Sequence, residues 1–278
     1  MGYFKLSNGE SLFYEDVGSG DNTIVMVSGW SVDHTYFIKP ANALKDVSRC
    51  IYYDHRGHGL SKDANKDDVS VETLAADLKE LFDGLHLENV TLLGWSMGVS
   101  VVLTFIKMFG CESLKQVILC DMTPKCLNDD EWHMGIHNGT YRIEDMEAEK
   151  GLPFFDLYKK FVVEAVPRLK KVPNFLLNIA LRKLLKKSDE KVLRSLSFSM
   201  KMQDNRDIVP TITVPITYLY PYPGSSFNPD LAEWYRAHAK TTYRSIRFDN
   251  ADHMFVSQYS KEFTETLRQI LQSDITSR

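Results

Sequence analysis

The chain has 278 residues, of which 44% are hydrophobic and 25% are charged, and its formal net charge is −4. This near-balance leaves no excess of positive charge to neutralise phosphates, so the composition argues against a nucleic-acid-binding protein. With 15 glycines and 10 prolines the chain is neither collagen-like nor of low complexity, and no apolar run approaches the roughly 20 residues that span a bilayer.

The first residues of the chain and the spacing of its cysteines bear on its cellular location and on whether it binds a metal. No basic stretch followed by an apolar one opens the sequence, and the 4 cysteines form neither a CxxC pair nor a metal-ligand spacing. We therefore expect reduced thiols in a cytoplasmic protein that needs no metal and no cofactor. The expected partner is a small-molecule substrate, without nucleic acid or a membrane span, and a homodimer stays open.

The first third of the chain alternates between predicted strands and helices. Asn8-Gly9 is a strong hairpin signal, and the apolar positions 71, 74, 78, 81, 82 and 85 follow a helical period. Strands are predicted at residues 3–6, 11–17, 23–27, 49–53, 90–93 and 114–120, and helices at residues 71–85 and 97–109. This alternation indicates a parallel sheet that is covered by helices on both faces.

The order then breaks, because the 93 residues at 122–214 contain no convincing strand. A crossover between parallel strands needs only about 10–12 residues, so most of this segment is an insertion. Helices are predicted at residues 154–166, 174–185 and 191–202. Their basic residues are expected to lie on solvated helix faces: Arg168, Lys170, Lys171, Arg182, Lys183, Lys186 and Lys187.

The alternating pattern resumes with strands at residues 216–220 and 243–248 and helices at residues 229–238 and 261–271. The predicted fold class is α/β, with a mostly parallel, doubly wound sheet of about eight strands. Residues 1–121 and 215–278 would form the core domain, and residues 122–214 would form a helical insertion.

The most informative motif is Gly94-Trp95-Ser96-Met97-Gly98, between a predicted strand and a predicted helix. A sharp strand-to-helix turn would project the Ser96 hydroxyl above the sheet, beside the free N–H groups of a helix N-terminus. A helix-capping serine with incidental glycines is the alternative. We interpret Ser96 as a nucleophile.

A serine nucleophile needs a general base within hydrogen-bonding reach. Of the 8 histidines, His253 follows the last predicted strand, and the ends of parallel strands share one edge of the sheet. We therefore expect His253 to be the base. The backbone N–H groups of Met97 and Trp30 would form the oxyanion hole, and Trp30 would also wall the pocket.

Four strings together resemble the α/β-hydrolase fold superfamily, and in particular its small lid-bearing esterases and haloperoxidase-like serine hydrolases. They are Ser28-Gly29-Trp30, Asp54-His55-Arg56-Gly57-His58-Gly59-Leu60-Ser61, Gly94-Trp95-Ser96-Met97-Gly98 and the late His253. The resemblance implies that the serine attacks an acyl carbon and that water hydrolyses the resulting acyl-enzyme. It specifies the fold and no substrate.

The acidic member of the triad departs from the family's usual position, a few residues beyond the strand at 216–220. Residues 221–226 hold no acid, and Asp230 opens a predicted helix, where an acid is a routine cap. Asp121 follows the strand at 114–120, a position that some family members use, and we favour it as the triad acid. Asp252 is rejected because neighbouring side chains point apart. Asp54 is read as structural, in a turn where Arg56 pairs with a carboxylate.

Substrate-binding side chains are expected beside the nucleophile and in the lid. The candidates are Trp95, Trp132, His133, His137, Phe154 and Phe155, with ordinary packing among the lid helices as the alternative. If these side chains face the cavity, the acyl or alcohol group is hydrophobic or aromatic.

We expect a hydrolase of carboxylic esters, with thioesters, lactones or amides as close variants. Two other readings stay open. One is chemistry on an aromatic substrate, like that of cofactor-independent dioxygenases of the same fold or of C–C bond hydrolases, although Met97 stands where the dioxygenases carry histidine. The other is a non-catalytic receptor for a small ligand. Dehalogenases and epoxide hydrolases are disfavoured, because their nucleophile is aspartate where this chain has Ser96.

Overall fold

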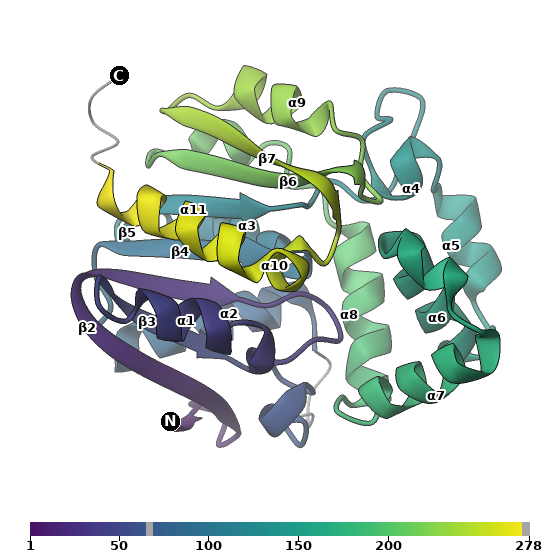
Figure 1. Cartoon of the computed structure of the whole chain (residues 1–278), viewed down its shortest axis with the longest axis horizontal. Coiled ribbons are helices and arrows are strands. Elements are labelled where there is room, and N and C mark those ends of the chain that lie inside the picture. Colours follow the sequence, from purple (N-terminus) through teal and green to yellow (C-terminus); the bar gives the residue numbers. More distant parts are fainter. Residues whose placement is uncertain (65–68, 274–278) are drawn as a thin grey trace.

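The computed structural model describes residues 1–64 and 69–273, and within them seven strands form one sheet (Figure 1). The strands are β1 Gly2–Lys5, β2 Ser11–Val27, β3 Ser48–Tyr53, β4 Val90–Trp95, β5 Leu114–Cys120, β6 Ile216–Gly224 and β7 Tyr243–Asp252. They run in the order β1-β2-β4-β5-β6-β7, with β3 paired to β2. The pairs from β2–β4 through β6–β7 are parallel.

Strand β2 explains why the described sheet has seven strands where the sequence predicted about eight. Residues 11–17 and 23–27 form one strand that bends back on itself. Before the bend β2 runs opposite to β3, with Tyr14 paired to Tyr53. After the bend β2 runs in the same direction as β3, with Met26 paired to Tyr52. Gly18 lies at the bend with φ of 86°, where a Cβ atom would stand 2.3 Å from the Ser48 carbonyl oxygen. A larger residue would clash there, so glycine at this position allows the two halves of β2 to pair with β3.

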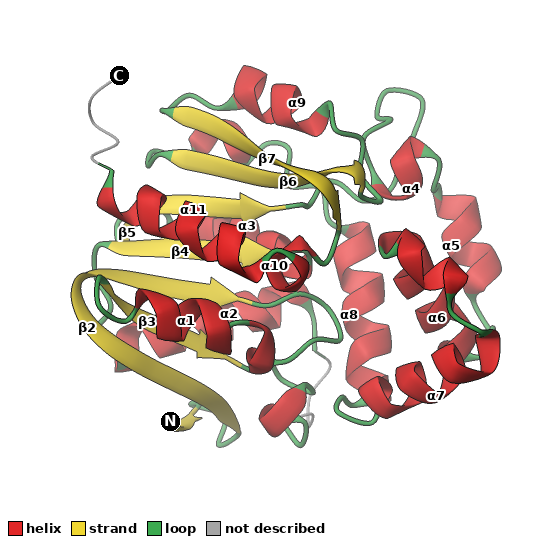
Figure 2. Ribbon diagram, in the orientation of Figure 1, coloured by secondary structure: helices red, strands yellow, loops and turns green. Residues whose placement is uncertain are grey.

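Helices cover both faces of the sheet, as predicted (Figure 2). One face carries α1 Ile38–Leu44, α10 Phe255–Gln258 and α11 Ser260–Gln272, and the other carries α2 Val71–Gly84, α3 Met97–Phe109 and α9 Leu231–His238. Successive residues of a strand point to opposite faces. Thus Ile24 and Met26 of β2 pack in the core beneath α1, α10 and α11, while Val25 and Val27 pack in the core beneath α2, α3 and α9. This half of β2 is therefore apolar on both sides.

Residues 122–214, hereafter the helical segment, connect β5 to β6. The segment holds α4 Ile136–Gly139, α5 Ile143–Glu149, α6 Phe154–Ala165, α7 Asn174–Leu185 and α8 Glu190–Met202. The three helices predicted from periodicity are confirmed as α6, α7 and α8. Figure 1 shows the segment beyond the ends toward which the parallel strands point. Along residues 1–64 and 69–273, no helix is both long and apolar enough to cross a membrane.

Candidate active site

Ser96 occupies the single residue between β4 and α3, and its backbone is strained. Its φ of 56° and ψ of −126° lie outside the regions that residues with a side chain normally adopt. The turn is tight because α3 packs against the end of β2: a Cβ atom on Gly98 would stand 2.2 Å from the Val27 carbonyl oxygen. The surrounding packing thus holds Ser96 in a strained conformation directly beyond the end of β4.

Three side chains from different strand ends form a continuous hydrogen-bond chain. Ser96 Oγ lies 2.9 Å from His253 Nε2, and His253 Nδ1 lies 2.7 Å from Asp121 Oδ2. Asp121 directly follows β5, and His253 directly follows β7. With its proton on Nδ1, the imidazole donates to the carboxylate, which leaves Nε2 free to accept the serine proton. All three residues are buried, Asp121 almost completely at 1% exposure.

Asp121 is fixed by contacts that the sequence did not indicate. Its φ is 47°, and its backbone N–H donates to the Leu219 carbonyl oxygen at 2.8 Å. The Ser225 hydroxyl, directly after β6, lies 2.8 Å from both carboxylate oxygens of Asp121. Residues 221–226 hold no acid, and the sequence pattern alone does not single out Ser225. The position directly beyond β6 does belong to the site. The residue at that position, Ser225, donates a hydrogen bond to the carboxylate of Asp121 instead of supplying a carboxylate itself.

The two other acids considered from sequence lie elsewhere. Asp230 is exposed at the first turn of α9. Asp252 accepts the Met254 backbone N–H at 2.9 Å and pairs with Arg168 at 3.3 Å. Among the described residues, the carboxylate within hydrogen-bonding distance of the His253 imidazole is that of Asp121.

A cavity of about 250 Å³ opens at Ser96 and His253. Its walls are mostly apolar and come from the loop after β2, from α6 and α7, and from Trp95. Sequence reasoning missed most of this lining, which includes Tyr36, Tyr158, Phe161, Val162, Leu177 and Leu181. Burial raises the pKa of Tyr36 to about 12, so its phenol stays neutral. We call this space the Ser96 cavity.

Two buried histidines bracket Trp30, which lines the Ser96 cavity. His55 Nε2 lies 3.0 Å from the Ser28 carbonyl oxygen, and His58 Nε2 accepts the Ser31 backbone N–H at 3.1 Å. Burial lowers the pKa of both imidazoles, that of His55 to about 3, so both are neutral. They fix the backbone on either side of Trp30.

The turn that carries these histidines is itself held by ion pairs, as the sequence predicted. Arg56 forms two hydrogen bonds with the Asp77 carboxylate of α2, at 2.5 and 2.7 Å, and also pairs with Glu10. Asp54 accepts the Leu60 backbone N–H at 2.8 Å and contacts His34. These ion pairs hold the turn in place, and the turn in turn holds the loop of Trp30 through His55 and His58.

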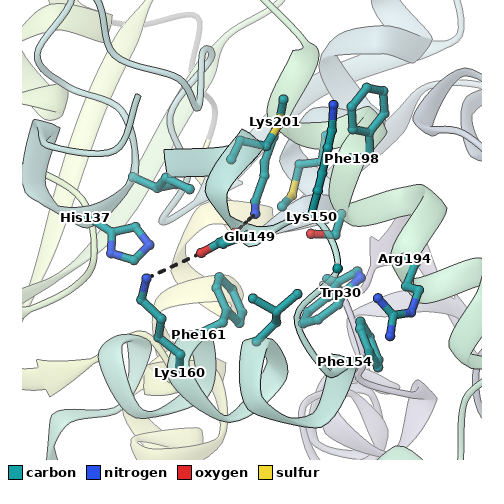
Figure 3. Close-up of a pocket in the computed structure, with 16 residues that line it drawn as sticks. Trp30, His137, Glu149, Lys150, Phe154, Lys160, Phe161, Arg194, Phe198 and Lys201 are labelled. Atoms are coloured by element: carbon teal, nitrogen blue, oxygen red, sulfur yellow. Dashed lines mark hydrogen bonds and ion pairs between the residues drawn. The ribbon is translucent and has the colours of Figure 1, made fainter. Parts of the chain in front are cut away.

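A second cavity of about 290 Å³ lies among α5, α6 and α8, and Trp30 and Phe161 line both cavities (Figure 3). We call it the outer cavity. Figure 3 shows Lys160 and Lys201 approaching Glu149 from two sides, at 3.4 and 3.0 Å. The two rings that separate the cavities pack edge to face at 5.3 Å.

The residues predicted to bind substrate fall into three places. Trp95 lines the Ser96 cavity, and its indole N–H donates to the His253 carbonyl oxygen at 3.2 Å. His137 and Phe154 line the outer cavity. The remaining three line neither cavity: Trp132 packs on Trp234, Phe155 lies under the Arg182 guanidinium, and His133 is exposed.

In the part of the chain that the structure describes, no group of three or more His, Cys, Asp or Glu side chains is arranged to hold a metal ion.

Comparisons with known proteins agree on the architecture. The family model described as alpha/beta hydrolase fold matches residues 22–142. The AB hydrolase superfamily protein YisY of Bacillus subtilis is 28% identical over 78% of this chain and 80% of its own length. The non-heme chloroperoxidase CPO-A1 of Kitasatospora aureofaciens is 31% identical over 42% of each chain. The solved structure of an esterase from Exiguobacterium antarcticum has a TM-score of 0.81 at 24% identity, covering 98% of this chain and 99% of that one.

Proposed function

The chain belongs to the α/β-hydrolase fold superfamily, and from that premise we propose that it is a serine hydrolase that cleaves a carboxylic ester through an acyl-enzyme. The observation that carries the proposal is the hydrogen-bond chain from Ser96 through His253 to Asp121. An ordinary serine hydroxyl is a weak nucleophile, and an adjacent imidazole that a carboxylate orients is the arrangement that activates it.

The proposed reaction begins when Ser96 Oγ attacks the acyl carbon while His253 Nε2 takes the hydroxyl proton. Asp121 stabilises the imidazolium that forms, and the Ser225 hydroxyl holds the carboxylate in place. The backbone N–H groups of Trp30 and Met97 stabilise the oxyanion. His253 then gives its proton to the leaving alcohol, and water attacks the acyl-enzyme with the same histidine as base.

The Ser96 cavity supports a small hydrophobic substrate, because its volume of about 250 Å³ is enclosed mainly by aliphatic and aromatic side chains. We propose that the helical segment acts as a lid domain over a core of residues 1–121 and 215–278. The His253 backbone N–H donates to Ala165 of α6 at 3.3 Å, which supports a direct tie between lid and active site. Buried free thiols at Cys50, Cys111, Cys120 and Cys126 support the proposed cytoplasmic location.

The serine–imidazole contact favours a hydrolase over a dioxygenase-like enzyme or a receptor. A dioxygenase-like His–Asp pair that deprotonates an aromatic substrate does not need a serine hydroxyl 2.9 Å from the imidazole, and neither does a receptor. Thioester, lactone or amide cleavage would use the same groups.

A series of p-nitrophenyl esters of increasing acyl length tests the proposal. We expect a burst of nitrophenol from the purified protein. Ser96→Ala and His253→Ala should each lower kcat by a factor on the order of 10³ or more. Ser257→Ala and His133→Ala change the same residue types at exposed positions and should keep the full rate. Undiminished turnover in Ser96→Ala would overturn the mechanism.

A further inference from the structure

Helix α7 exposes apolar side chains that no core contact explains. Phe175 and Ile179 are each 64% exposed, and Leu176 is 48% exposed. In an α-helix these positions share one side, because residues three and four apart are neighbours. Val172 just before the helix is also exposed. We call Val172, Phe175, Leu176 and Ile179 the α7 apolar face.

Basic residues flank the α7 apolar face on both sides along the chain. Residues 165–188 contain seven basic residues and no acidic one. This stretch carries a formal charge of +7 in a chain whose net charge is −4, so the rest of the protein carries −11. The basic residues are Arg168, Lys170 and Lys171 before the face and Arg182, Lys183, Lys186 and Lys187 after it.

Most of this charge is available to a partner. Arg168 pairs with Asp252 and Lys187 with Asp33. Among the described residues, no ion pair is formed by Lys170, Lys171, Arg182, Lys183 or Lys186, and all five are exposed. Of these, Arg182 also stacks its guanidinium on the Phe155 ring. Exposed cations by themselves are explained by their solvation. A group of exposed large apolar side chains that is bordered by cations is typical of an interaction surface.

The opposite side of α7 faces the interior. Leu177 and Leu181 are buried, and both line the Ser96 cavity. Figure 1 shows α7 at the outer margin of the helical segment, away from the sheet. The helix thus has one side that packs on the protein and another that presents apolar and basic groups to the outside.

We propose that α7 docks on the surface of an anionic lipid bilayer. An interfacial helix buries apolar side chains at the headgroup boundary, while its Lys and Arg residues attract anionic lipid. The charge distribution supports this partner: +7 on one end and −11 on the remainder orient the molecule with α7 toward a negative surface. A second copy fits poorly, because pairing two α7 apolar faces would bring two strongly basic stretches together. The inference goes beyond the proposed reaction and does not depend on it.

Co-sedimentation of the full chain with lipid vesicles tests the proposal. One set of vesicles is pure phosphatidylcholine, and in the other about a third of the lipid is phosphatidylserine, which supplies the negative surface. We expect binding to the second set, and binding should fall as salt is raised because surface charges are screened.

Two groups of variants separate the contributions. The triple variant Arg182→Gln, Lys183→Gln and Lys186→Gln should weaken vesicle binding by a factor on the order of 100, because each lost cation is expected to lower the affinity roughly fivefold. Phe175→Ser with Ile179→Ser should weaken it by about tenfold or more. The matched controls are Lys107→Gln, Lys240→Gln and Lys261→Gln for charge, and Leu60→Ser with Met108→Ser for exposed apolar groups. The controls should bind as the wild type does.

Three results would overturn the proposal. The first is equal binding to both sets of vesicles or to neither. The second is an equal loss in the control variants. The third is self-association in sedimentation velocity that Phe175→Ser with Ile179→Ser abolishes while vesicles are not bound, which would assign the face to a second copy. Because no step reads ester cleavage, failure here leaves the proposed hydrolase activity standing.

Discussion

At the scale of single residues, the proposed site depends on which strand end supplies the carboxylate that contacts His253. Asp121 follows β5, and the residue at the corresponding place beyond β6 is Ser225, whose hydroxyl lies against the Asp121 carboxylate. The position one strand away suffices because neighbouring parallel strands end at the same edge, so the imidazole can meet a carboxylate from either strand. The Ser225 hydroxyl donates a hydrogen bond that holds the Asp121 carboxylate in place.

The role of the acid can be tested with an isosteric pair of variants. In Asp121→Asn the amide cannot stabilise the imidazolium and favours the wrong imidazole tautomer, so we expect kcat for a p-nitrophenyl ester to fall by a factor on the order of 10³–10⁴. Asp230→Asn, at an exposed acid on α9, should keep the wild-type rate. If only Asp230→Asn abolishes turnover, the assignment of Asp121 is wrong.

At the scale of elements, helix α6 shapes both cavities. Phe161 contributes to the Ser96 cavity and to the outer cavity, and its ring packs against Trp30 at 5.3 Å. Phe155, on the same helix, contributes to neither and lies under Arg182. The length of acyl chain that fits beside Ser96 should therefore depend on Phe161.

Truncating that wall should lengthen the preferred acyl chain. In Phe161→Ala we expect the ratio of kcat/KM for p-nitrophenyl decanoate to that for the butyrate to rise about tenfold, since two further buried methylenes contribute about 1.6 kcal/mol. Phe155→Ala is the matched control and should leave the ratio unchanged. An equal rise in both variants would mean that general loosening of α6 is responsible.

At the scale of the whole molecule, buried neutral histidines link stability to pH. Burial lowers the pKa of His55 to about 3, and its Nδ1 atom is buried without a hydrogen-bond partner. An unfolded histidine takes up a proton near pH 6.5, so as the pH falls the unfolded chain binds a proton that the folded chain does not. The stability contribution of neutral His55 is thus present above pH 6.5 and is lost progressively toward pH 3.

Denaturant unfolding at pH 7 and pH 5 measures this loss. Between these two values we expect His55 to account for about 2 kcal/mol of lost unfolding free energy, and His55→Gln should remove that part of the pH dependence. Comparing the two proteins isolates His55 from the other titrating groups. His133→Gln, at an exposed histidine, should show the full wild-type loss, and the same loss in His55→Gln would contradict the prediction.

Local sequence determined much of this protein. The helix-covered parallel sheet, the strand–Ser96–helix turn, the place of His253 after the last strand and the three longest helices of residues 122–214 follow from periodicity and from glycine positions, which act over a few residues. The short helices α1, α4, α5 and α10 were not predicted. The bend of β2 was missed because it depends on contact between Gly18 and Ser48, which is a tertiary contact.

Only the tertiary structure decided which side chains face one another across the site. Ser225 meets Asp121 over 104 positions, and Trp30 and Phe161 separate two cavities. Trp132, Phe154 and Phe155 are all aromatic residues of the helical segment, and the sequence gives no reason to tell them apart. Of the three, only Phe154 lines the outer cavity, because the packing of α5, α6 and α8 sets the direction of each ring. A pattern of residue types records which chain segments form helices or strands and which face of each is apolar. The contacts between segments follow from how those faces fit together, and a local pattern does not contain that information.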